Sequence, residues 1–174
     1  LYTEWVYSLY FGDPYEELKY MRQILELDDQ LAAGYYIIGL INLRLNQYNK
    51  AIPEYIRALE LYDKWDIKPL WVYNYTSPGY AYHKTGQFRK EEKLYKKAEK
   101  DFPGDYILLY RQAVLALSKG KTKAADEYIA RYVSALEEKS SSEAVIASGL
   151  GGIYRDAGML QKAEEKYREA LLLQ

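Results

Sequence analysis

The C-terminal stretch decides the fold, and residues 144–174 read AVIASGLGGIYRDAGMLQKAEEKYREALLLQ. Apolar and small residues recur there at intervals of three and four on both sides of Gly158, namely Leu150, Tyr154, Ala163, Tyr167 and Ala170. This spacing predicts two amphipathic helices separated by a glycine that ends the first. Because one such pair cannot bury its apolar face alone, we expect further copies along the chain.

The same pattern recurs upstream at a nearly fixed period. Residues 32–65 align with residues 72–105, and four pairs of positions match: Gly39 with Gly79, Tyr48 with Phe88, Tyr55 with Tyr95, and Ala58 with Ala98. A weaker copy covers residues 106–139, and a partial first copy covers about residues 1–31. Small residues at the matched glycine positions allow two helices to approach closely, and a large aromatic fills the space beside them.

These copies resemble the tetratricopeptide repeat, a helix-turn-helix unit of about 34 residues with the pattern W-x2-L-G-x2-Y, A-x3-F and P. The Trp position of that pattern holds Tyr35, Tyr75, Leu109 or Ala147. The resemblance implies an all-α fold, a right-handed superhelical solenoid of antiparallel helix-turn-helix hairpins. We expect residues 1–174 to form a single solenoid and, since the chain begins without Met, to be a fragment of a longer protein.

The repeat is disturbed at three places. Six extra residues at 66–71 predict a lengthened helix with Pro69 in its first turn. Four extra residues lie near residues 140–143, where Ser140 and Glu143 have the spacing of a capping box. Pro78 falls inside a predicted helix and predicts a kink; in the alternative, the helix restarts with Ser77 as its N-cap.

Composition excludes several classes of function. Lys and Arg number 24 against 25 Asp and Glu, so no field of one sign would attract nucleic acid or an anionic membrane. The chain has no cysteine, which excludes disulfides and thiolate metal sites and favours the cytoplasm. No apolar run approaches the roughly 20 residues that a transmembrane helix needs.

Fragments of catalytic motifs are present but incomplete. The run Gly120-Lys121-Thr122 resembles the end of a phosphate-binding loop, but Leu115 stands where that loop needs glycine. In a match to the dinucleotide-binding pattern G-x-G-x-x-G, Tyr154 occupies the position of the third glycine. His83 is the only histidine, and alone it forms neither a charge relay nor a metal site. We therefore expect no enzyme activity, no metal and no cofactor.

The resemblance also implies where a partner binds, because the first helix of each hairpin lines the concave surface in that family. The residues in register with that lining are the candidate peptide-binding groove, namely Tyr2, Tyr36, Leu40, Leu43, Arg44, Tyr73, Tyr80, His83, Lys84, Tyr110, Val114 and Arg155. The repeat pattern does not require the tyrosines of this candidate groove, and an aromatic ring with a polar tip is a common binding anchor. In the alternative, these tyrosines pack between neighbouring hairpins.

The sequence thus predicts a protein-interaction scaffold that binds a peptide or protein segment with apolar or aromatic side chains in a tyrosine-rich groove. The Lys and Asn set with which chaperone-binding members of the family hold a carboxylate is absent, since Tyr36 and Leu40 replace two of its residues and only Arg111 survives. Two alternatives remain. One is self-association through exposed stacking faces at the ends of the solenoid, and the other is a regulatory arm of a larger multidomain protein.

Overall fold

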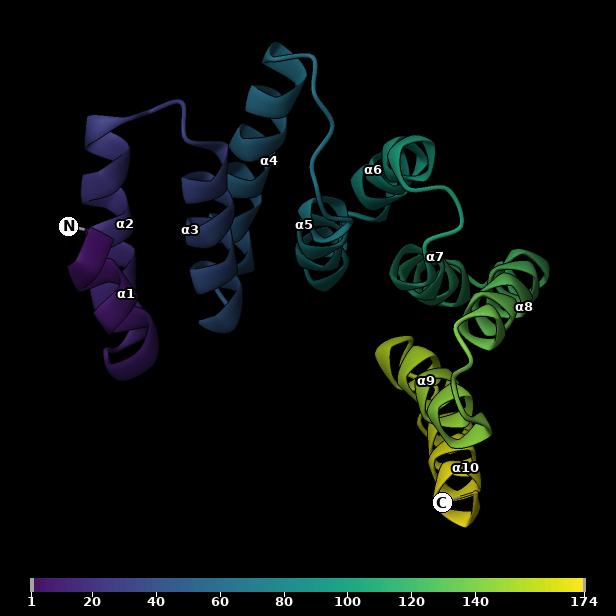
Figure 1. Ribbon diagram of the computed structural model, residues 1–174. Coiled ribbons are helices and arrows are strands. Elements are labelled where there is room, and N and C mark those ends of the chain that lie inside the picture. Colours follow the sequence, from purple (N-terminus) through teal and green to yellow (C-terminus); the bar gives the residue numbers. More distant parts are fainter. Residues whose placement is uncertain (1, 174) are drawn as a thin grey trace. The chain divides into compact units, whose positions relative to one another are not determined.

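The structure is a computed structural model that describes residues 2–173. Within that range the chain forms ten helices and no strand (Figure 1). The helices are α1 (Tyr2–Phe11), α2 (Pro14–Leu27), α3 (Ala32–Arg44), α4 (Tyr48–Lys64), α5 (Tyr73–Lys84), α6 (Phe88–Asp101), α7 (Tyr106–Ser118), α8 (Thr122–Glu138), α9 (Glu143–Asp156) and α10 (Leu160–Leu172). The predicted all-α class is therefore confirmed.

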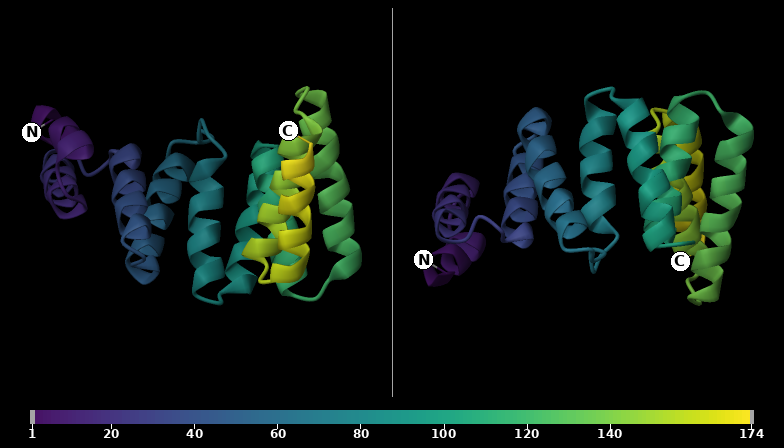
Figure 2. Two further views of the ribbon diagram at one scale, coloured as in Figure 1. Left: turned by 90° about the horizontal axis from the view of Figure 1, so that it is seen from below. Right: turned by 90° about the horizontal axis from the view of Figure 1, so that it is seen from above.

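The chain divides into two compact units, unit 1 at residues 1–87 and unit 2 at residues 88–174. In unit 1, α1 packs on α2, α3 packs on α4, and α3 also contacts α2 and α5 (Figure 2). In unit 2, α7 packs on α8 and α9 on α10, while α7 also contacts α6 and α9. The single solenoid over residues 1–174 stays a prediction, because each unit is defined by its own contacts.

Two of the helix pairs are closed by a glycine that faces an aromatic ring, as the sequence predicts. A Cβ atom on Gly39 of α3 would lie 2.6 Å from Cδ1 of Tyr55 on α4. In unit 2, a Cβ atom on Gly151 of α9 would lie 2.7 Å from the ring of Tyr167 on α10. These distances are too short for any side chain, so glycine sets the separation of the two helices.

Short turns reverse the chain within each pair. Asn46 follows α3 with a φ of 57°, and the amide of Gln47 donates to the carbonyl of Asn42 at 2.8 Å. Gly158 follows α9 with a φ of 80° and supports the same hydrogen-bonding pattern. A left-handed residue in this place satisfies the last carbonyls of the helix and turns the chain back.

The six extra residues do not lengthen a helix, so that prediction was wrong. Helix α4 ends at Lys64, and α5 begins only at Tyr73. Asp66 adopts a left-handed φ of 53°, which stops the helix, and the amide of Ile67 donates to the carbonyl of Tyr62 at 3.1 Å. Pro69 lies buried in the connection, and proline disfavours a helical conformation in the residue before it.

One smaller prediction and one alternative were also wrong. Ser142, and not Ser140, is the N-cap of α9, since its Oγ accepts a hydrogen bond from the amide of Val145. Ser140 instead has a left-handed φ of 57° after α8. Helix α5 continues through Pro78, so it does not restart with Ser77 as its cap. The kink at Pro78 stays a prediction.

A half-buried carboxylate joins α7 to α9 in unit 2. The hydroxyl of Tyr110 donates to Oδ2 of Asp156 at 2.8 Å, and Arg111 reaches the same oxygen at 3.2 Å. Arg155 donates to Oδ1 of Asp156 from Nε at 3.0 Å and from NH2 at 2.8 Å. Burial acts to raise the pKa of Asp156, but the hydrogen bonds and the two arginines outweigh it and lower that pKa.

None of the helices in the described part of the chain combines the length and the apolar composition needed to cross a lipid bilayer.

The first prediction concerns the close approach at Gly39. In an unobstructed helix, replacing glycine by alanine stabilises by roughly 0.5–1 kcal/mol. At Gly39 the added methyl group would overlap the ring of the buried Tyr55, so we expect Gly39→Ala to destabilise the protein by about 1–3 kcal/mol. Urea unfolding followed by circular dichroism measures the change.

Gly151→Ala is the matched control with a smaller expected loss, because its partner Tyr167 is only half-buried and can move outward. A higher urea midpoint for Gly39→Ala would contradict this account.

The second prediction concerns Asp156. We expect Asp156→Asn to cost about 1.5–3 kcal/mol at pH 7, the range for hydrogen bonds to a charged group. Because the pKa of Asp156 is lower in the folded protein, this stabilisation is present above the unfolded value of about 3.9 and is lost as the pH falls through the folded pKa. The unfolding midpoints of the two proteins should therefore converge as the pH falls through the folded pKa of Asp156. Asp126→Asn, at an exposed position on α8, is the control and should match the unmodified chain at every pH. Equal stability of Asp156→Asn at pH 7 would refute the role given to this carboxylate.

Candidate protein-interaction surface

One predicted groove residue, Tyr36, lies where α3 contacts α5 in unit 1. The hydroxyls of Tyr36 on α3 and Ser77 on α5 lie 3.3 Å apart. The ring of Tyr36 also packs against Tyr55, with the ring centroids 5.4 Å apart. Burial raises the pKa of Tyr36, and the hydrogen bond with Ser77 partly offsets that rise. Tyr36 is thus partly a packing residue that joins two neighbouring helices.

One face of α5 carries the next residues of the surface. Tyr73, Ser77, Tyr80 and Lys84 follow one another at helical spacing and so share that face. Tyr80 meets Tyr48 edge to face with centroids 6.2 Å apart, and Nζ of Lys84 lies 5.2 Å from the centroid of Tyr80. Leu40 and Leu43 on α3 and His83 on α5 are half-buried. The face therefore offers aromatic rings beside one ammonium group.

The connection before α5 adds exposed apolar side chains to this surface. We call residues 65–73 the aromatic insert. Its large exposed side chains, with their exposed fractions, are Trp65 (40%), Ile67 (51%), Leu70 (81%), Trp71 (65%) and Tyr73 (49%). Pro69 and Val72 are buried within it, so the segment is anchored to the unit. The insert thus displays these side chains on a held backbone.

Sequence reasoning missed most of the aromatic insert. Only Tyr73 was among the predicted groove residues, whereas Leu70 and Trp71 were assigned to a longer helix. A signal was nevertheless present, because the six residues that have no place in the repeat lie beside or include two of the three tryptophans of the chain. Residues that lie outside the repeat do not have to occupy its packing positions.

Other predicted groove residues are engaged elsewhere. Arg44 forms an ion pair with the buried Glu17 of α2. Tyr110 and Arg155 in unit 2 both bind Asp156. Tyr2, on α1, is 71% exposed and packs its ring on Trp5, with the centroids 5.5 Å apart.

The assignment of Val114 to the predicted groove was wrong. Its side chain is 2% exposed and belongs to the core cluster of unit 2 with Leu109, Tyr132 and Ile153. Those partners come from α7, α8 and α9, so α9 covers the part of α7 on which Val114 lies. Val114 therefore cannot line a surface that binds a partner.

The surface can bind through aromatic and apolar contacts, with Lys84 as a cation. Among residues 2–173, no group of three or more His, Asp or Glu side chains is placed to hold a metal ion.

Comparisons with known proteins agree with this architecture. The sequence model of the tetratricopeptide repeat matches residues 32–64, the range of α3 and α4. A search of curated protein sequences found no match. Among solved structures, the type IV pilus biogenesis factor PilW is 20% identical with a TM-score of 0.72, over 98% of this chain and 75% of that one.

Two further solved structures share this fold. YrrB, described as a tetratricopeptide-repeat protein with an unusual peptide-binding site, is 19% identical with a TM-score of 0.60, over 92% of this chain and 78% of that one. A chain of the APC/C hetero-tetramer Cut9–Hcn1 is 19% identical with a TM-score of 0.69, over 97% of this chain. This chain spans only 32% of the length of that one.

Residues 32–64 thus match the tetratricopeptide repeat, and the fold of nearly the whole chain is similar to that of these solved structures.

Proposed function

We propose that the chain is a protein-interaction scaffold and that unit 1 binds a peptide or protein segment across the aromatic insert and the exposed face of α5. The observation that carries this proposal is the exposure of Leu70, Trp71 and Tyr73 on an anchored segment. Contiguous large apolar side chains at the surface of a folded protein typically mark an interaction site. Trp and Tyr are also the side chains that most often dominate binding energy in protein interfaces.

The neighbouring residues extend the surface along α5. Tyr80 stands two helical turns after Tyr73 on the same face, and Tyr36 reaches α5 from α3 through Ser77. An extended or helical segment that follows α5 would contact these rings in succession. This surface retains the tyrosine-rich character predicted for the groove, with its centre moved toward the aromatic insert.

The cations available near this surface narrow the class of segment that we expect it to bind. Of the three cations expected to serve the groove, Arg44 pairs with Glu17 and Arg155 with Asp156. Lys84 stands over the ring of Tyr80, and no carboxylate pairs with it among the described residues. We therefore expect a segment with apolar or aromatic side chains and an acidic residue placed to reach Lys84.

Relatives of the same fold support binding as the function. YrrB is described by its peptide-binding site, and the Cut9–Hcn1 structure is itself a complex of different chains. Their sequence identity to this chain is low, so the support extends to the kind of function and not to the partner.

Selection of random peptides displayed on phage against the chain tests the proposal. We expect enriched peptides to lose at least about tenfold in affinity on Trp71→Ala and on Tyr80→Ala, as is usual for aromatic anchors of an interface. Tyr15→Ala is the matched control, because Tyr15 is an exposed tyrosine on α2 of the same unit, and it should change affinity less than twofold. Isothermal titration calorimetry measures affinity, and circular dichroism verifies that each variant is folded.

The proposal fails if enriched peptides bind Trp71→Ala and Tyr80→Ala as tightly as the unmodified chain. Light scattering over a concentration series separates the self-association alternative. A mass above that of a monomer, reduced by Trp71→Ala, would assign the aromatic insert to contacts between copies of the chain and not to a different partner.

A further inference from the structure

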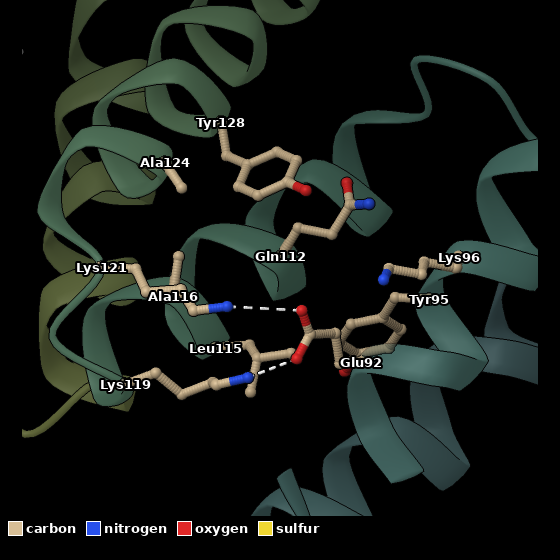
Figure 3. Close-up of a pocket in the computed structure, with 10 residues that line it drawn as sticks. All are labelled: Glu92, Tyr95, Lys96, Gln112, Leu115, Ala116, Lys119, Lys121, Ala124 and Tyr128. Carbon is tan, nitrogen blue, oxygen red and sulfur yellow. Dashed lines mark hydrogen bonds and ion pairs between the residues drawn. The ribbon is translucent and has the colours of Figure 1, made fainter. Parts of the chain in front are cut away.

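A small cavity in unit 2 lies among α6, α7 and α8, apart from the surface proposed above. Its volume is about 100 Å³. Leu115, Ala116 and Ala124 form its apolar part. Figure 3 shows the side chains of Gln112, Tyr128 and Lys96 directed into the same space from α7, α8 and α6.

The cavity contains a buried acceptor without a partner. Gln112 is only 8% exposed, and its Nε2 donates to Oε2 of Glu99 at 3.3 Å. Its Oε1 is buried and accepts no hydrogen bond in the described part of the chain. Buried polar atoms nearly always have a partner in native proteins, so the amide oxygen of this cavity-lining side chain is available to accept from a donor that enters the cavity.

The charged side chains that line the cavity indicate the charge of such a ligand. Lys96, Lys119 and Lys121 line the cavity in the described part of the chain, together with one carboxylate, Glu92. Glu92 forms ion pairs with Lys119 and, at 3.4 Å, with Lys121. Glu99, which accepts from Gln112, is paired with Arg131. Lys96 is then the lining cation that no carboxylate pairs with among the described residues, and it favours an anionic ligand over a neutral or cationic one.

We propose that this cavity binds a small carboxylate that also carries a hydrogen-bond donor. The carboxylate would face Lys96, the donor would reach Oε1 of Gln112, and a short carbon stem would lie on Leu115 and Ala116. Two sources supply this chemistry. One is a free hydroxy acid of a few carbons, whose hydroxyl is the donor, and the other is an acidic residue of a polypeptide, whose backbone N–H is the donor. The inference does not depend on the function proposed for unit 1.

Titration of the ¹⁵N-labelled chain with lactate and with propionate tests the site by NMR. The two acids have the same carbon number, but only lactate has a hydroxyl. We expect lactate to shift the amide resonances around Gln112 and to bind about threefold to tenfold more tightly than propionate, the range for one added hydrogen bond. Gln112→Met should remove this preference, and Lys96→Met should weaken both acids at least about threefold. Lys93→Met, at an exposed position on the same helix, is the control and should change neither.

A second titration distinguishes the two sources. Tighter binding of the peptide N-acetyl-Ala-Glu-Ala-amide than of lactate, with the same loss in Lys96→Met, would assign the site to an acidic residue of a polypeptide. Tighter binding of lactate would assign it to a free acid. The proposal is overturned if no probe shifts the resonances around Gln112, or if the shifts persist unchanged in Lys96→Met. The exposed Lys96 keeps the test decisive even if Gln112→Met fails to fold.

Discussion

The close approach of two helices at one glycine is the constraint on which the rest of the structure depends. At Gly39 and at Gly151 an aromatic ring of the second helix occupies the space that a Cβ atom would need. This contact fixes the separation of the pair, and the pair then presents an apolar face that it cannot bury alone. Packing of further helices on that face follows from the same need. Positions that are used neither in the contact within a pair nor in the packing between pairs are free to carry function.

Two tyrosines of the predicted groove, one in each unit, have different surroundings. In unit 1, Tyr80 on α5 remains half-exposed beside the aromatic insert. In unit 2, Tyr110 on α7 is held by Asp156 of α9, and its hydroxyl would lie 2.9 Å from a Cβ atom on Gly152. The small residue and the carboxylate on α9 thus draw Tyr110 into packing. The helix that covers a repeat position therefore decides whether an aromatic there serves the core or a partner.

Regular period explains what the sequence could predict. The helix pairs, the glycine contacts and the turn at Gly158 follow a spacing that repeats along the chain, so they could be predicted. The aromatic insert lies outside that spacing, and a left-handed Asp66 with a buried Pro69 replaced the expected longer helix. The groove was only partly predictable, because the partners Glu17 and Asp156, which engage Arg44 and Arg155, come from other helices.

A crystal structure of the chain with a bound peptide is the most direct test of the central claim, that unit 1 binds a partner through the aromatic insert and α5. We predict that the peptide will lie along α5, with its largest side chain against Trp71 and Tyr73 and an acidic residue near Lys84. A peptide bound only to α1, or only within unit 2, with the aromatic insert still open to solvent, would contradict this account.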